Sequence, residues 1–116
     1  MKIRFQADAD PDPDIGRGLL RRGPTIDWRP AQGFIADAIP DPEVLELASN
    51  QGRVLVFGDV NTMPLHFAVL VASRPSPGVI PIPSRVTVGE AIERLLITWL
   101  SWTAEDIENQ IWWLSG

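Results

Sequence analysis

The fold class follows from residues 53–59, which read Arg-Val-Leu-Val-Phe-Gly-Asp. After the arginine, residues 54–57 form an uninterrupted apolar run, which is typical of a parallel strand buried on both faces. Gly58 ends the run, and Asp59 follows it directly. The stretch therefore predicts a buried strand over 53–57 with a carboxylate just beyond its C-terminal end.

Segments with strand character alternate with helical segments along the rest of the chain. The predicted strands are residues 2–7, 25–29, 53–57 and 79–82, with a fifth at 111–114. The predicted helices are residues 13–22 and 41–50, a third from residue 62 or 63 to the turn-rich segment 73–78, and a long one from 88 to the acidic turn at 103–109. Their start signals are Asp12-Pro13, Asp41-Pro42 and the capping box from Thr87 to Glu90.

This alternation predicts an α/β fold with three layers, in which a mostly parallel sheet of four to five strands has helices on both faces. Right-handed crossovers make 2-1-3-4-5 the expected strand order. The sheet then has its switch point between the first and third strands, where ligands of open α/β sheets bind. Asp8 and Asp59 follow those two strands, so we expect their carboxylates at the switch point.

Length and composition limit the possible classes of protein. The 116 residues fit a single domain over 1–116, and the absence of cysteine excludes disulfides and thiolate chemistry. No signal peptide or bilayer-spanning apolar run is recognisable, which predicts a cytoplasmic protein without membrane contact. The formal net charge of -5 argues against tight, nonspecific binding of nucleic acid and is compatible with a few local phosphate contacts.

The acidic residues suggest a metal site for Mg²⁺ or Mn²⁺. These ions prefer oxygen ligands and retain several waters, so two or three converging carboxylates suffice to hold one. Such an ion activates water and offsets charge on a phosphodiester. The expected catalytic and metal-binding acids are Asp8, Asp41 and Asp59, supplemented by Asp10 and Glu43, with Asn61 and Thr62 to orient water or contact phosphate. Asp41 is also a candidate for a helix N-cap without any other role.

The phosphoacceptor receiver domains also carry acids at the ends of their first and third strands. Those domains need a lysine after the fifth strand. The single lysine of this chain is Lys2, at the start of the first strand, which excludes the receiver interpretation. The single histidine, His66, cannot build a multi-histidine metal site, and we expect it to pack against or cap the helix that follows Asp59.

Two further groups of residues have a functional and a structural interpretation. Arg17 is a candidate phosphate contact, although arginines near the end of a helix also form ordinary solvated faces. Trp112 and Trp113 are adjacent, so on a strand they point to opposite faces of the sheet. A tryptophan that the monomer leaves uncovered is a strong interface anchor, which predicts a homodimer or a partner protein at this end of the chain.

Several segments resemble a family of small PIN-like proteins of unknown function from bacteria and cyanobacteria. The similar segments are Phe5-Gln6-Ala7-Asp8, residues 41–48 (Asp-Pro-Glu-Val-Leu-Glu-Leu-Ala), residues 53–59, residues 59–67 with their Thr-Met-Pro and His-Phe pairs, and Gly89-Glu90-Ala91-Ile92. Their order extends the resemblance over nearly the whole chain.

PIN domains are generally Mg²⁺- or Mn²⁺-dependent ribonucleases, and many are VapC-type toxins that a small antitoxin protein holds inactive. The resemblance therefore implies a ribonuclease acting on RNA, with Asp8, Asp41 and Asp59 as the metal-binding acids. The chain departs from the family pattern at Ala9, Phe57, Gly58, Asn61 and Leu65, where acidic, polar or basic residues are common. A non-catalytic PIN-like module that acts through protein contacts is the alternative.

Overall fold

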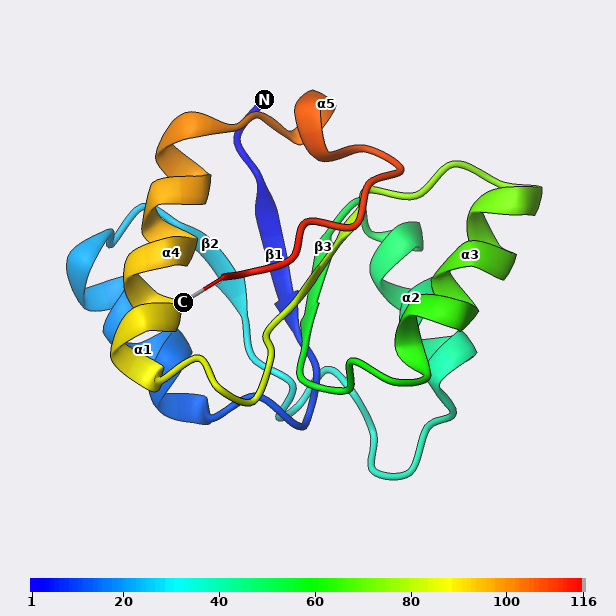
Figure 1. The fold of residues 1–116 in the computed structure, drawn as a ribbon, viewed down its shortest axis with the longest axis horizontal. Coiled ribbons are helices and arrows are strands. Elements are labelled where there is room, and N and C mark those ends of the chain that lie inside the picture. Colours follow the sequence, from blue (N-terminus) through cyan, green and yellow to red (C-terminus); the bar gives the residue numbers. More distant parts are fainter. Residues whose placement is uncertain (116) are drawn as a thin grey trace.

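The computed structural model describes residues 1–115, in which strands and helices alternate (Figure 1). The strands are β1 (Arg4–Ala7), β2 (Asp27–Arg29), β3 (Val54–Phe57) and β4 (Val79–Pro81). The helices are α1 (Pro13–Arg22), α2 (Asp41–Asn50), α3 (Met63–Ser73), α4 (Val88–Ser101) and α5 (Ala104–Ile107). Among these, none combines the length and the apolar composition that crossing a bilayer requires.

The four strands form one sheet in the order β2-β1-β3-β4, and every neighbouring pair is parallel. The predicted α/β class and the first four positions of the predicted order are thus confirmed. In the register of the two central strands Ala7 lies opposite Val56, and the amide of Asp8 donates to the carbonyl of Val56 at 2.9 Å. The C-terminal ends of β1 and β3 are therefore level, which places the residues after them at one edge.

Helices cover both faces of the sheet (Figure 1). The alternating side chains of β3 show the division, since Val54 and Val56 pack in the core beneath α1 and α4, while Leu55 and Phe57 pack in the core beneath α2 and α3. All four are buried. The apolar run that predicted a strand covered on both faces is explained by these two cores.

The predicted fifth strand is wrong for residues 111–114, although the segment does lie beside β4. One parallel bridge joins Ile111 to Val79, and the amides of Trp112 and Leu114 donate to the carbonyls of Val79 and Pro81 at 2.9 and 3.0 Å. Pro81 has no amide proton, so β4 cannot donate the next hydrogen bond of a parallel ladder to this segment. The segment follows the edge of the sheet without becoming a strand.

The helix starts agree with two of the predicted signals and correct the third. The Asp12 carboxylate accepts from the amide of Asp14 at the start of α1, and Thr87 and Glu90 form the predicted capping box of α4. The N-cap of α2 is instead Pro40, in an extended conformation, and Asp41 is the first helical residue, whose carboxylate lies 3.5 Å from the Thr62 hydroxyl. The interpretation of Asp41 as an N-cap is wrong, and its carboxylate does not cap the helix.

The segment predicted as an acidic turn at 103–109 contains the single-turn helix α5. Thr103 and Asp106 form a second capping box there, with hydrogen bonds of 3.2 and 2.8 Å. The sequence predicts a turn here because the helix is only 4 residues long, too short for a periodic apolar pattern. Ile107 is its buried residue and closes the core beneath α1 and α4.

Candidate functional site

Four carboxylates gather at the C-terminal edge of the two central strands. Asp8 follows β1 directly, Asp59 lies two residues after β3, and Asp41 begins α2. Asp10, in the loop after β1, accepts a hydrogen bond through Oδ1 from the amide of Gly58 at 3.0 Å. This contact ties the loop after β1 to the loop after β3, at the edge where the sequence placed the site.

Thr62 connects the acid after β3 to the acid at the start of α2. Its hydroxyl donates to Oδ2 of Asp59, and its Oγ1 lies 3.5 Å from Oδ2 of Asp41. A hydroxyl has one proton to donate, so the long contact with Asp41 is the weaker of the two. Thr62, a predicted supporting residue, thus lies between two of the three predicted catalytic acids.

The loop after β3 folds around the Asp59 carboxylate. Oδ1 of Asp59 accepts from the amides of Asn61 and Thr62 at 2.9 and 3.2 Å, which is a turn that aspartate readily forms. The Thr62 hydroxyl, followed by these two amides, holds the pKa of Asp59 below its ordinary value, and the nearby His66 lowers it slightly further. Asp59 therefore keeps its negative charge.

Asp8 has the opposite electrostatic environment. Burial raises the pKa of Asp8 above its ordinary value, and the carboxylates of Asp10, Asp41 and Asp59 raise it further, against a hydrogen bond from the Ala9 amide that lowers it. Environments that move the pKa values of neighbouring carboxyl groups apart are common at functional sites. The three repelling neighbours of Asp8 are the acids that the sequence grouped with it.

This difference predicts opposite changes in stability when each acid is neutralised. When folding raises the pKa of an acid, its ionised form destabilises the fold at pH values above the folded-state pKa. This destabilisation vanishes at pH values below the pKa of the same acid in the unfolded chain. Asp8→Asn keeps an oxygen for the Ala9 amide and is expected to raise the free energy of unfolding at pH 7 by about 0.5–2 kcal/mol, the range of surface-charge optimisation. The gain should disappear near pH 3, below the ordinary pKa of aspartate.

Asp59→Asn is the matched control, because folding lowers the pKa of Asp59. An acid of this kind stabilises the fold at pH values above its unfolded-state pKa, and the stabilisation is lost as the pH falls through its folded-state pKa. The variant is expected to unfold more easily than the wild type at pH 7. Urea titrations of both variants at pH 7 and pH 3 check the signs. A loss of stability from Asp8→Asn at pH 7 would contradict the electrostatic assignment.

The donor chemistry of this edge fits a hard divalent cation. Within residues 1–115, no group of three or more Asp, Glu or His side chains is close enough together to form a ready ligand set. Mg²⁺, however, commonly takes one or two protein carboxylates and completes its octahedron with water. Asp8 and Asp59 are the residues that would hold such an ion, with Asp41 and Asp10 beside them.

The remaining predicted supporting residues lie around this edge in different roles. Glu43 is exposed in the first turn of α2, and Asn61 contributes its backbone amide to Asp59. Arg17 is exposed on α1 and forms an ion pair with Asp14. His66 is half-buried on α3, beside a groove with Leu45, and it does not cap the helix.

Two cavities flank the acids. One, of about 310 Å³, is lined by Asp10 and Asp59 together with the segment from Ile82 to Val88. The other, of about 530 Å³, is lined by Asp8, the start of α1, Trp28 and the segment after β2. Sequence reasoning missed this second cavity and Trp28, and the only signal for it was an aromatic residue in a short strand beside the first acid.

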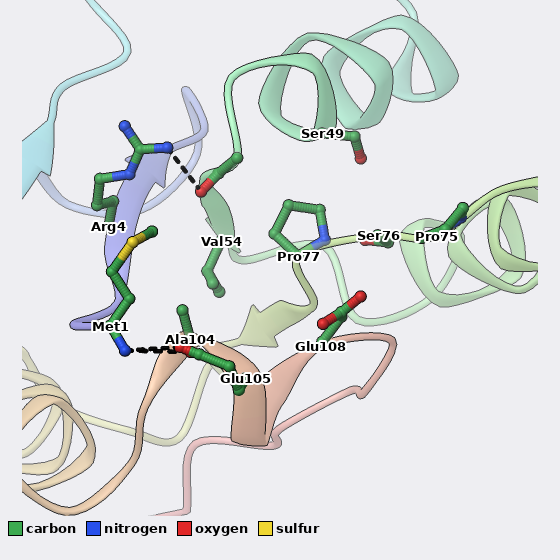
Figure 2. Close-up of a pocket in the computed structure, with 11 residues that line it drawn as sticks. Met1, Arg4, Ser49, Val54, Pro75, Ser76, Pro77, Ala104, Glu105 and Glu108 are labelled. Atoms are coloured by element: carbon green, nitrogen blue, oxygen red, sulfur yellow. Dashed lines mark hydrogen bonds and ion pairs between the residues drawn. The ribbon is translucent and has the colours of Figure 1, made fainter.

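A further pocket of about 440 Å³ lies at the opposite end of the strands (Figure 2). Arg4 lies at its side, and its guanidinium donates to the carbonyl of Gly52 at 3.4 Å (Figure 2). It also donates to the carbonyl of Gln51 at 2.8 Å, so it stabilises the end of α2. Glu105 pairs with the terminal ammonium of Met1 at 2.6 Å. Arg4, Glu105 and the terminal ammonium are thus used in structural contacts, and Glu108 is the remaining acid of the lining. The acidic edge, with four carboxylates, is the better candidate for chemistry.

The tryptophans predicted as an interface are partly exposed. Trp112 is 37% exposed and Trp113 is 49% exposed, and the ring of Trp112 lies 4.6 Å from that of Trp102. Their contact with a second copy or a partner protein stays a prediction.

Comparison with family models, curated proteins and solved structures found no match to the chain. The similarity to PIN-like proteins, with the activity that it implies, stays a prediction drawn from the sequence.

Proposed function

We propose that the chain is a PIN-like, Mg²⁺- or Mn²⁺-dependent ribonuclease. The observation that carries the proposal is the gathering of Asp8, Asp41 and Asp59 at the switch point of a parallel sheet, with Thr62 between the last two. Burial, and then repulsion by the carboxylates of Asp10, Asp41 and Asp59, raises the pKa of Asp8 at this edge. A bound cation would offset this repulsion and so stabilise the close placement of the carboxylates.

The chain's own residues have separable tasks in this proposal. Asp8 and Asp59 hold the cation, and Asp41 and Asp10 complete its surroundings through direct or water-mediated contacts. Thr62 and the loop amides fix the orientation of Asp59, so that its position is set before substrate binds. The bound ion supplies the activation of water and the charge compensation that phosphodiester hydrolysis needs.

RNA binding through this edge is expected to be weak and local. The net charge of -5 opposes the approach of the RNA phosphates. Arg17 is the predicted phosphate contact, and it must exchange its ion pair with Asp14 for a phosphate oxygen. This exchange is inexpensive because both side chains are exposed.

The direct test is incubation of the purified full chain with end-labelled single-stranded RNA in Mn²⁺, in Mg²⁺ and in EDTA. Cleavage products are expected with the metal ions and none with EDTA. If the chain binds Mn²⁺ and leaves a varied set of RNAs intact, the ribonuclease proposal is wrong.

As a ribonuclease of this type, the chain is proposed to act in the cytoplasm as the toxin of a toxin–antitoxin pair. Its expression should then arrest growth of a bacterial host, and co-expression of a small protein encoded beside it should restore growth. The Asp8→Asn variant serves as the control and should be harmless. Equal growth with wild type and variant would remove the toxin assignment.

A second candidate function rests on the partly exposed Trp112 and Trp113, which suit a protein interface. In this alternative the PIN-like domain is a non-catalytic interaction module. Trp113→Ala would then abolish association, measured by sedimentation of the chain alone or with its partner, whereas Asp8→Asn would leave association unchanged.

A further inference from the structure

The cavity of about 530 Å³ beside Asp8 is large enough to enclose part of a small organic ligand. Its walls come from three places in the chain: the loop after β1, the first two turns of α1, and β2 with the segment that follows it. The side chains that matter most are those of Asp8, Asp12, Arg17, Trp28 and Asp37. The cavity thus combines an aromatic surface with charged groups and begins at one of the proposed metal ligands.

Trp28 is held rigidly at the wall of this cavity. Its ring lies 5.7 Å from that of Phe5, which is fully buried in the core. Its indole also packs against the backbone of α1, because a Cβ atom placed on Gly16 would lie 2.3 Å from the indole Nε1. An indole that is fixed in this way loses little conformational entropy when a flat ligand stacks on it.

The charged groups around the cavity indicate which flat ligand fits. Carboxylate oxygens accept hydrogen bonds from the exocyclic amino groups of nucleobases, and Asp12 and Asp37 both line the cavity. Arg17, on the wall formed by α1, supplies a cation for the phosphate that accompanies a base. Adenine, cytosine and guanine carry an amino group, whereas uracil does not, so the acidic wall discriminates against uracil.

We propose that this cavity is a nucleobase subsite for single-stranded RNA, in which an amino-bearing base stacks on Trp28. The inference rests on the proposed ribonuclease function and adds to it a substrate preference. A base held on Trp28 lies in the cavity that Asp8 also lines, so the adjoining phosphodiester is close to the acidic edge. Single-stranded RNA is the expected form, because a base inside a duplex is not free to stack on a side chain.

The test uses the full chain in EDTA, where binding is separated from cleavage. Adenosine and uridine are the probes, because nucleosides lack the phosphate that the acids repel, and the indole N–H signal of Trp28 in NMR titrations is the readout. Adenosine is expected to shift this signal and uridine to bind more weakly. Trp28→Ala should weaken adenosine binding by about 5- to 150-fold, the loss that one base–aromatic stack produces.

Two variants separate stacking from folding. Trp28→Phe keeps an aromatic surface and should retain most of the affinity, while Ala31→Phe fills the cavity from its rim and should remove binding without disturbing the packing of Trp28 on Gly16. Trp113→Ala changes a tryptophan that does not line the cavity and should bind adenosine like the wild type.

The outcomes distinguish this inference from the function on which it rests. Mn²⁺-dependent cleavage that Trp28→Ala and Ala31→Phe leave unchanged would overturn the subsite and keep the ribonuclease. Trp28-dependent adenosine binding without any cleavage would keep the subsite and overturn the ribonuclease. Binding of argininamide in place of adenosine would show that the cavity takes the cationic side chain of a protein partner, and would also overturn the subsite.

Discussion

Asp8→Asn is expected to lower the rate of Mn²⁺-dependent RNA cleavage by more than about 100-fold. Removing even an outer-shell partner of a metal ligand typically costs about 10- to 100-fold in affinity or activity, and a direct ligand should cost more. The substitution preserves the size of the side chain and an oxygen for the Ala9 amide. Initial rates at saturating Mn²⁺ measure the effect.

This variant gives a clean result because it is also expected to stabilise the fold at pH 7. A loss of activity therefore cannot be attributed to unfolding, which thermal denaturation of the same sample verifies. Glu108→Gln, an acid beside the pocket at the opposite end of the strands, is the control and should cleave like the wild type. Comparable rates for Asp8→Asn and Glu108→Gln would show that the acid after β1 has no part in catalysis.

Phe57→Ala is expected to reduce the free energy of unfolding by about 3–5 kcal/mol, the range for removing a phenyl ring from a packed core. Phe57 is fully buried at the end of β3 and packs beneath α2 and α3. Because small domains are stable by only about 5–15 kcal/mol, the variant should lose a large share of its stability and unfold at a clearly lower urea concentration than the wild type. Urea unfolding followed by tryptophan fluorescence gives the difference.

Phe34→Ala is the matched control, since it removes the same ring from a side chain that is 49% exposed. Its ring lies 4.5 Å from the guanidinium carbon of Arg29, a contact worth about 0.5–1 kcal/mol at an exposed site. If both phenylalanine variants lost similar stability, Phe57 would not hold the core that positions the loop after β3.

The strands and helices were predictable where a local signal defines them. The apolar run before Asp59, the proline at the start of α1 and the capping box at Thr87 act over a few residues, and the structure contains each of them. The edge that carries the acids was also predictable, because the order of parallel strands decides which strand ends are neighbours.

The features that were mispredicted or missed depend on residues that are distant in sequence. The segment at 111–114 has the composition of a strand, but whether a ladder forms depends on Pro81 in its neighbour. The conformation of Pro40 decided that Asp41 is inside α2 rather than its cap. The cavity beside Asp8 requires Trp28 to pack on Gly16, a contact between β2 and α1 that no local pattern reveals.

Binding of Mn²⁺ by the purified chain, followed by electron paramagnetic resonance and by NMR line broadening, decides whether the acidic edge is a metal site. We expect one Mn²⁺ to bind and to broaden the amide signals of residues 8–10 and 58–62 before all others. Asp8→Asn and Asp59→Asn should each weaken binding by at least about 10-fold. Absence of binding by the wild type, or equal binding by these variants, would contradict the assignment of the carboxylates to a metal ion.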